Sequence, residues 1–383
     1  MSISDKRHTI KLETLTPVHI GSGAFLQNNV EFVKDNKDIY IIDPKKILEI
    51  IGIDKLDYWV GAIDRGDDIT QVISRLGKKS TPDKYAKRSL KLYDNVDLEA
   101  RTTLKECMHN GRGIAYIPGS SIKGAIRTAI FADIAYGDEE LGNMIKFDKG
   151  PYSCSLVEGK LFGESANNNV FRFIHIGDAY FSTGCEIALN EVNLNIRESH
   201  TKLLDKDKKQ LIEAIGKGCE AEFSIKIQSE YNAFAHSKTA KENESKKIIK
   251  ELPENCLSIE KLFETINSNT QKLVSDEIEI WKDIMLQYDN DTTAQAYILS
   301  LNEILNVVNN CDKKQCVLRV GHASGWRFMT GAWVEPIEEI FEKVISISRA
   351  NAKNYEQYDF PKTRRIGEGS NNILGFVKLT IAE

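Results

Sequence analysis

Apolar and polar residues alternate along several short segments of the chain, and this period of two predicts β-strands with one buried face. The first such segment, 9–15, ends at a Thr-Pro pair and is followed by a glycine-rich stretch through Gly23. The same reasoning predicts further strands at 30–33, 38–42, 113–118, 171–181, 219–228, 316–320 and 375–381.

Apolar residues three and four positions apart mark the helices, because this spacing places them on one helical face. Ile122, Ile126 and Ile130 share such a face in a helix expected from Gly119 to about Tyr136. A later helix is expected from about residue 336, after the strand at 316–320 and a glycine-rich loop.

Two long charge-rich segments, 44–108 and 230–310, are expected to be mostly helical, with a mobile Lys/Glu-rich loop at 237–250. Strands that interleave with helices without a regular repeat favour an α+β fold of ferredoxin-like (RRM-like) domains over a doubly wound sheet. The expected organisation is an amino-terminal domain, 1–228, with a helical insertion at about 44–108, and a carboxyl-terminal part, 229–383, that begins with helices.

The composition limits the classes of function. With 51 Lys and Arg against 56 Asp and Glu, the net charge is −5, which excludes a polybasic protein, so any anion site must be a local patch. The seven cysteines are scattered and include no C-x-x-C pair, which favours reduced thiols and no metal site. No apolar run approaches the roughly 18 residues of a membrane span, so we expect a cytoplasmic protein that binds no membrane and no cofactor.

The helix start after the strand at 113–118 is the most informative candidate site. It contains Gly119, Ser120, Ser121, Lys123 and Arg127. Serine caps, free amides, the positive end of the helix dipole and two cations one turn apart are typical of a phosphate site. The competing interpretation is ordinary capping beside a solvated face. A nucleotide P-loop is excluded because Lys and Ser or Thr do not follow the second glycine.

Other glycine-rich or basic segments contain further candidate contacts. The amino-terminal loop offers His19, Gly21, Ser22 and Gly23; the late loop offers Arg319, His322, Ser324, Trp326 and Arg327; and a basic turn offers Lys362, Arg364 and Arg365. Cations beside an aromatic ring, without an acid, are typical of sites for single-stranded RNA. The alternatives are a packed, hydrogen-bonded His19, which we favour, a core position for Phe328 and a solvated basic turn.

Three motifs follow one another along the chain: Leu15-Thr-Pro-Val-His-Ile-Gly-Ser-Gly23, Ile117-Pro-Gly-Ser-Ser-Ile-Lys-Gly-Ala-Ile-Arg127 and Leu318-Arg-Val-Gly-His-Ala-Ser-Gly-Trp326. In order and spacing they resemble the RAMP superfamily of CRISPR proteins. The late glycine-tryptophan loop and the basic turn at 361–365 are most similar to the family of fifth Csm subunits in type III-A effector complexes.

This resemblance implies a non-catalytic, RNA-binding subunit that caps the backbone filament at the 3′ end of the guide RNA (crRNA). It implies support of crRNA maturation and antiviral defence. The implied partners are crRNA and target RNA, other Csm subunits and host nucleases. The implied RNA contacts fall on the glycine-rich helix start and on the amino-terminal loop.

Alternative functions remain open from the residues alone. A metal-free endoribonuclease that processes guide RNA would need a base such as His19 or His175 near the RNA. A protein-only scaffold would owe its glycine loops to packing. Within the resembled family, the subunit that binds the 5′ end of the guide is a third possibility.

Overall fold

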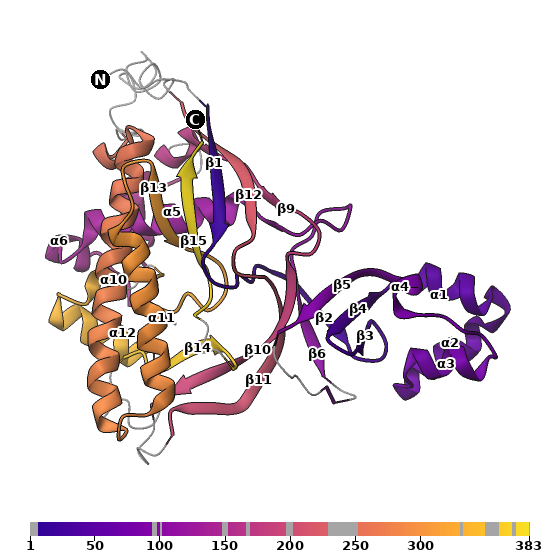
Figure 1. Cartoon of the computed structure of the whole chain (residues 1–383). Helices are drawn as coiled ribbons and strands as arrows, with labels where there is room; N and C mark the ends of the chain where they lie inside the picture. The colour runs from indigo at the N-terminus through magenta and orange to yellow at the C-terminus, as the bar shows by residue number, and fades with distance from the viewer. Residues whose placement is uncertain are drawn as a thin grey trace.

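The computed structural model describes residues 7–93, 98–99, 102–147, 152–165, 169–196, 202–228, 252–329, 332–348, 360–369 and 373–382. Two β-sheets organise these residues, and long helices cover the first sheet (Figure 1). This arrangement confirms the predicted α+β class.

The first sheet combines strands from distant parts of the sequence. Its order is β13-β15-β1-β12-β9-β7, and β8 also pairs with β12. The strands are β1 (Arg7–Thr14), β7 (Tyr116–Ile117), β8 (Ile174–Ile176), β9 (Ala179–Phe181), β12 (Glu220–Ile227), β13 (Gln315–Arg319) and β15 (Phe376–Ile381). Because β15 pairs with β1 and β13 pairs with β15, the sheet joins residues from both sides of the expected boundary at 228.

The sequence pattern predicted most of this sheet. The strands expected at 9–15, 219–228, 316–320 and 375–381 are confirmed as β1, β12, β13 and β15. The continuous strand expected at 171–181 is wrong, because a short 3-10 helix, η2 (Val170–Phe173), precedes two separate strands. Between β8 and β9, Gly177 and Asp178 meet the start of a helix: the Asp178 carboxylate accepts the N–H of Gly119.

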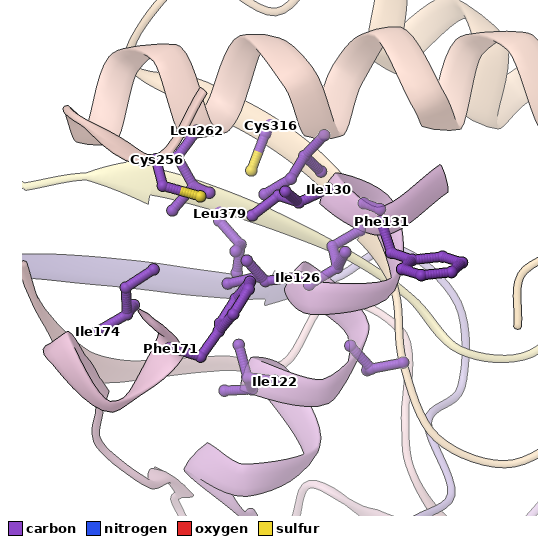
Figure 2. Packing of buried hydrophobic residues seen from close by; sticks show 14 of the residues in the cluster. Ile122, Ile126, Ile130, Phe131, Phe171, Ile174, Cys256, Leu262, Cys316 and Leu379 are labelled. Atoms are coloured by element: carbon purple, nitrogen blue, oxygen red, sulfur yellow. The ribbon is translucent and has the colours of Figure 1, made fainter. Parts of the chain in front are cut away.

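The helix α5 (Gly119–Ala135) forms over the predicted span and packs its apolar stripe against the first sheet. Figure 2 shows Ile122, Ile126 and Ile130 within this core, near Phe171 and Leu379 of the sheet side. The three isoleucines are fully buried, as the helical spacing predicted.

Two long helices, α10 (Ile259–Gln287) and α11 (Thr292–Asn309), pack against each other, and α10 contacts α5 and β13. They confirm the helical prediction for 230–310 where that segment is described, whereas the predicted loop at 237–250 lies outside the described residues. The shorter helices are α6 (Glu139–Gly142), α7 (Ser155–Phe162), η4 (Glu254–Cys256), η5 (Ala332–Val334) and α12 (Glu338–Ser348). Among the described helices, none is both long and apolar enough to cross a membrane.

The second sheet has the order β2-β6-β11-β10-β5-β4-β3, and β14 also pairs with β10. A long hairpin at its centre was not predicted from the sequence pattern, because several buried positions of the first hairpin strand hold Glu or Asn and hide the alternation. The strands are β2 (Gly21–Gln27), β3 (Phe32–Asp35), β4 (Asp38–Ile42), β5 (Ala86–Leu92), β6 (Thr103–Cys107), β10 (Glu186–Asn195), β11 (Leu204–Ile215) and β14 (Thr363–Gly367).

The segment 44–85 forms a knob of helices between β4 and β5, at the right of Figure 1. It comprises α1 (Pro44–Ile51), η1 (Ile53–Lys55), α2 (Leu56–Arg65), α3 (Ile69–Arg75) and α4 (Pro82–Tyr85). The side chain of Asp43 caps α1 by accepting the Lys45 N–H at 3.0 Å. The expected helical insertion is therefore found, but its extension to 108 is wrong, because β5 and β6 belong to the sheet.

Candidate nucleic-acid interface

A pocket of about 610 Å³ lies where three glycine-containing segments meet. The amino-terminal segment contributes Ile20 and Gly21, α5 contributes Ser121, Gly124 and Arg127 among others, and the late loop contributes 319–325. The structure therefore brings together the three motifs that are far apart in the sequence.

The amino-terminal and late segments touch through their backbones. Gly321 has a φ of 78°, and a Cβ there would lie 2.6 Å from the carbonyl oxygen of His19. The N–H of His322 donates to the same carbonyl at 2.9 Å. Glycine at 321 thus allows the close approach that shapes one wall of the pocket.

The start of α5 differs from the prediction. Gly119 is required there, because a Cβ would lie 2.3 Å from the carbonyl oxygen of Ile176. Its N–H donates to Asp178 Oδ1 at 2.7 Å. This N–H is therefore already hydrogen-bonded to a carboxylate and is not free to bind a phosphate. Neither Ser120 nor Ser121 caps the helix, which begins after Pro118 without a side-chain cap. Ser120 is exposed, and Ser121 lines the pocket.

The two cations of α5 have different surroundings. Arg127 pairs with Glu158 at 2.7 Å and lies 5.5 Å from the centre of the Phe162 ring, so the expectation of no nearby acid is wrong. Lys123 is half-buried, and among the described residues no carboxylate pairs with it. Burial and the charge of Arg127 lower the pKa of Lys123. Among the described residues, Lys123 is therefore the cation of α5 that no carboxylate compensates.

Arg319 is buried and braces the late loop instead of facing solvent. Its Nε–H donates to the Leu374 carbonyl and its Nη2–H to the Ala323 carbonyl, both at 3.0 Å. The guanidinium also lies against the rings of Phe328 and Phe376, 4.7 and 4.8 Å from their centres. Phe328 packs against Phe376, as the alternative of a packed phenylalanine predicted.

Trp326 and Arg327 also hold the loop in place. The indole N–H of Trp326 donates to the Tyr152 hydroxyl at 2.9 Å, and its ring lies against Phe360. Arg327 pairs with Glu335 at 2.9 Å. Ser324, which lines the pocket, donates its hydroxyl to the Gly321 carbonyl at 2.8 Å. The expectation of an acid-free loop is thus wrong for Arg327.

The predicted basic turn is part of strand β14, which Lys362 directly precedes. Arg364 is buried and pairs with Glu277 at 2.5 Å. Arg365 pairs with Glu191, which also accepts a hydrogen bond from His322 Nε2 at 2.6 Å. These arginines have acidic partners from other elements, so the expectation of unpaired cations here is wrong.

His19 is buried, with 1% of its surface exposed. Its Nδ1–H donates to the Glu213 carbonyl at 2.6 Å, and burial lowers the pKa of His19 to about 4. The favoured alternative of a packed, hydrogen-bonded histidine is confirmed.

Gly21, Ser22 and Gly23 begin strand β2 and are exposed; they were expected to form a loop. The Ser22 hydroxyl donates to Glu106 at 3.3 Å, and a Cβ at Gly23 would contact nothing within 4 Å.

Sequence reasoning missed the acids that compensate these cations, which are Glu158, Glu191, Glu277 and Glu335. It also missed Asp178, which accepts the N–H of Gly119. They lie on elements that only the tertiary structure brings near the loops. Glu191 lies in an apolar stretch of β10, and a charged residue in such a stretch is a usable signal for a buried partner.

Comparisons with known proteins agree on one family. The sequence model of the RAMP superfamily matches residues 11–309. A protein of Methanocaldococcus jannaschii named CRISPR system Cms protein Csm5 is 25% identical over 415 residues, which cover 98% of this chain and 89% of that protein.

Two solved structures are similar in fold at 16% sequence identity. One is a chain of the cryo-EM structure of a Csm–crRNA–target RNA ternary complex of a type III-A CRISPR-Cas system, with a TM-score of 0.62 over 98% of this chain and 100% of that one. The other is the crystal structure of T. onnurineus Csm5, with a TM-score of 0.61 over 96% of this chain and 99% of that one.

Proposed function

This chain belongs to the RAMP superfamily, and from that premise we propose that it is an RNA-binding subunit of a type III-A CRISPR (Csm) ribonucleoprotein. In this role it caps the backbone of the complex at the 3′ end of the crRNA and supports crRNA maturation and interference. Its partners are crRNA with bound target RNA and the other Csm subunits. The similarity to Csm5 over nearly the whole chain supports this position in the complex.

The observation that carries the proposal is the pocket between the three motifs. Gly21, Gly124 and Gly325 are exposed on its lining, and a Cβ at Gly124 or Gly325 would contact nothing within 4 Å. Such walls let a sugar–phosphate backbone approach closely. Lys123, one turn from Arg127 on α5, supplies a charge without a carboxylate partner among the described residues. Contacts of this kind position a backbone without reading its sequence.

We propose that the subunit has no nuclease activity of its own. His19 is buried and its Nδ1 is held by a carbonyl, so it cannot reach a bound ribose. His322, which lines the pocket, is tied to Glu191, and His175 is bonded to Gln228 at 2.7 Å. These contacts support a binding role, in which recruited nucleases perform the maturation.

The proposal is tested by purifying the tagged protein from its native host at mild salt and sequencing the RNA that accompanies it. We expect spacer-derived guides with trimmed 3′ ends, together with other Csm subunits. If the other subunits are recovered without RNA, and the complex stays assembled after nuclease treatment, the protein-only scaffold is favoured. Cleavage of a repeat RNA by the purified chain without metal would contradict the non-catalytic role.

Lys123→Ala tests the contribution of the α5 cation that precedes the pocket-lining residue Gly124 in the sequence. Removal of one phosphate contact is expected to lower the slope of log affinity against log salt for single-stranded RNA by about 0.7. Fluorescence anisotropy across a salt series measures this slope. The matched control is Lys313→Ala, which removes an exposed lysine just before β13. The pocket lies at the other end of this strand, at Arg319, so the slope is expected to stay unchanged. Equal slopes for the two variants would remove Lys123 from the interface.

A further inference from the structure

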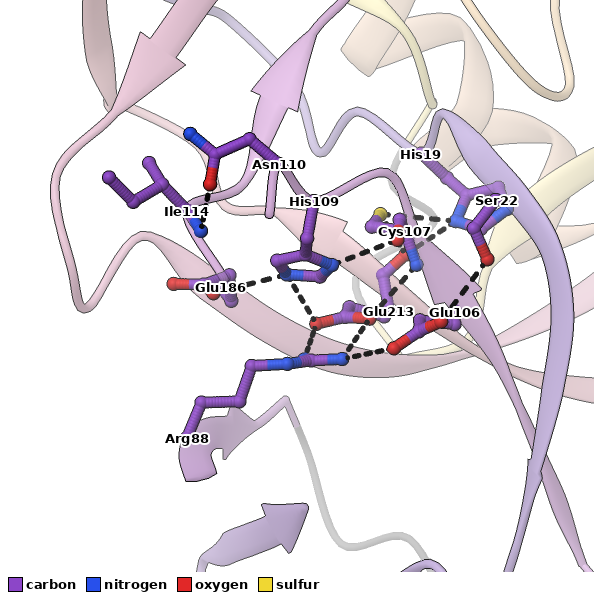
Figure 3. A network of polar contacts seen from close by, with 10 residues as sticks. All are labelled: His19, Ser22, Arg88, Glu106, Cys107, His109, Asn110, Ile114, Glu186 and Glu213. Carbon is purple, nitrogen blue, oxygen red and sulfur yellow. Dashed lines mark hydrogen bonds and ion pairs between the residues drawn. The ribbon is translucent and has the colours of Figure 1, made fainter. Parts of the chain in front are cut away.

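A second polar cluster lies outside the pocket, where the second sheet meets the connection from β6 to β7. Figure 3 shows the imidazole of His109 beside Glu186 and Glu213, with Arg88 and Glu106 next to them. Glu213 is fully buried, and the side chains of His109 and Glu186 are 10% and 8% exposed. The proposed function does not use this cluster.

The hydrogen bonds of His109 define its tautomer. Nδ1–H donates to the Cys107 carbonyl at 2.9 Å, so the neutral ring carries its lone pair on Nε2. Nε2 is buried and has no hydrogen-bond partner among the described residues. It faces Glu186 Oε1 at 3.4 Å and Glu213 Oε1 at 3.5 Å. A lone pair that faces two carboxylate oxygens is repelled unless a positive charge lies between them.

The carboxylates around His109 outnumber the cations beside them. Glu106, Glu186 and Glu213 contribute −3; Arg88, which pairs with Glu106 at 2.8 Å and with Glu213, contributes +1, and Lys87, which acts on Glu106, contributes another +1. With a neutral imidazole the sum is −3 + 2 = −1, so a bound cation would compensate the remaining negative charge.

We propose that this cluster binds a divalent transition-metal ion, with His109 Nε2 and the carboxylates of Glu213 and Glu106 as ligands and Glu186 beside them. The ligand atoms of Glu106, His109 and Glu213 lie within 4.8 Å of one another. In a tetrahedral Zn²⁺ site with bonds of about 2.0 Å, neighbouring ligand atoms are about 3.3 Å apart, close to the 3.5 Å between His109 Nε2 and Glu213 Oε1. Mixed imidazole and carboxylate ligands suit Zn²⁺ first and Mn²⁺ next.

Hydrogen bonds from and to the backbone hold the proposed ligands in place, as in known metal sites. The Nδ1–H of His109 is held by a backbone carbonyl, and Glu213 accepts the Cys107 N–H at 2.9 Å. Such bonds orient the ligands before the ion binds. The ion would join β6, the connection that follows it and β11 at one point. Because the Glu213 carbonyl holds His19 and Glu106 holds Ser22, it would also fix the amino-terminal wall of the pocket.

The test uses the full-length chain, stripped with a chelator and titrated with Zn²⁺ and, separately, Mn²⁺ by calorimetry, with metal content measured after dialysis. We expect one ion per chain for wild type. In His109→Ala the affinity is expected to fall by more than about 100-fold. Losing a residue that only hydrogen-bonds to a metal ligand already lowers affinity by about 10- to 100-fold. His175→Ala, an exposed histidine outside the cluster, is the matched control and is expected to bind as wild type does.

Glu186→Gln keeps the shape of the side chain and serves if His109→Ala does not fold; it is expected to weaken binding of the ion. Absence of stoichiometric binding by folded wild type would overturn the proposal, as would equal affinity in the His109 or Glu186 variant. An imidazolium signal from His109 at neutral pH by NMR in the presence of Zn²⁺ would also overturn it, because a proton would then occupy the position of the ion.

Discussion

At the scale of single residues, Glu277 is the centre of a buried polar network between α10, α11 and β14. It accepts hydrogen bonds from Arg364 Nε at 2.5 Å, from the Trp281 indole at 3.0 Å and from the Tyr297 hydroxyl at 2.9 Å. Removing one partner of such a pair leaves an uncompensated buried charge. Glu277→Ala is therefore expected to lower the free energy of unfolding by about 3–5 kcal/mol, measured by urea denaturation.

The control for this change lies two residues further along the same helix, where exposed Glu279 pairs with Lys282 at 2.8 Å. Glu279→Ala is expected to change stability by no more than about 0.5 kcal/mol. Similar losses in the two variants would contradict the assignment of Glu277 as the buried partner.

The same network predicts a pH dependence. Burial raises the pKa of Glu277, but Arg364 outweighs burial and holds the pKa below its ordinary 4.5. A lowered pKa in the folded state stabilises the protein fully above the unfolded pKa, and this contribution is lost as the pH falls through the folded pKa. The stability difference between wild type and Glu277→Gln is expected to shrink below about pH 4.5 in urea titrations at several pH values. A stability difference between the two proteins that stays constant down to pH 2 would contradict the lowered pKa of Glu277.

The residue types of the pocket could be predicted from the sequence, but their partners could not. Lys123 and Gly119 were identified from spacing after a strand, because a helix start has a local signature. The pairs Arg127–Glu158 and Arg364–Glu277 join residues that only the fold brings together. For the same reason His109, Glu213 and Glu186 could not be connected, since no local spacing relates β10, β11 and the segment after β6.

At the scale of elements, two glycines of α5 have opposite requirements. A Cβ at Gly119 would meet the backbone oxygens of Ile176 and Gly177 at 2.3 and 2.7 Å, whereas a Cβ at Gly124 would contact nothing within 4 Å. Gly119→Ala is expected to destabilise the protein by about 1–3 kcal/mol. Gly124→Ala is expected to stabilise it by up to about 1 kcal/mol, because alanine favours a helix interior.

Thermal and urea unfolding of both variants measure this pair of effects, and each variant is the control of the other. Equal stability of Gly119→Ala and wild type would contradict the close approach of α5 to the end of β8.

The helix α5 itself could be predicted because its apolar residues repeat at the helical period. The hairpin β10–β11 could not, because buried Glu186, Glu191 and Glu213 interrupt the pattern by which strands are found.

At the scale of the whole molecule, the knob at 44–85 is separable from the pocket. It has its own apolar cluster, which includes Ile47, Trp59 and Ile73, and it joins the second sheet where Ile42 lies opposite Ala86. Replacing 45–84 by a short turn is therefore expected to keep the β4–β5 hairpin. Affinity for single-stranded RNA in the anisotropy assay is expected to change by no more than about twofold, because the sites share no partners. A larger loss in a variant with native circular dichroism would place RNA contacts on the knob.

One feature of the first sheet also concerns the order of events during synthesis. β15 lies between β13 and β1, and Val377 pairs with Thr14, so the centre of the sheet joins segments separated by almost the whole chain. While the ribosome is still translating the intervening residues, one edge of β1 has no strand to pair with. Such an edge can pair with another nascent chain. Correct assembly therefore depends on keeping β1 apart from its copies on neighbouring ribosomes until β15 emerges.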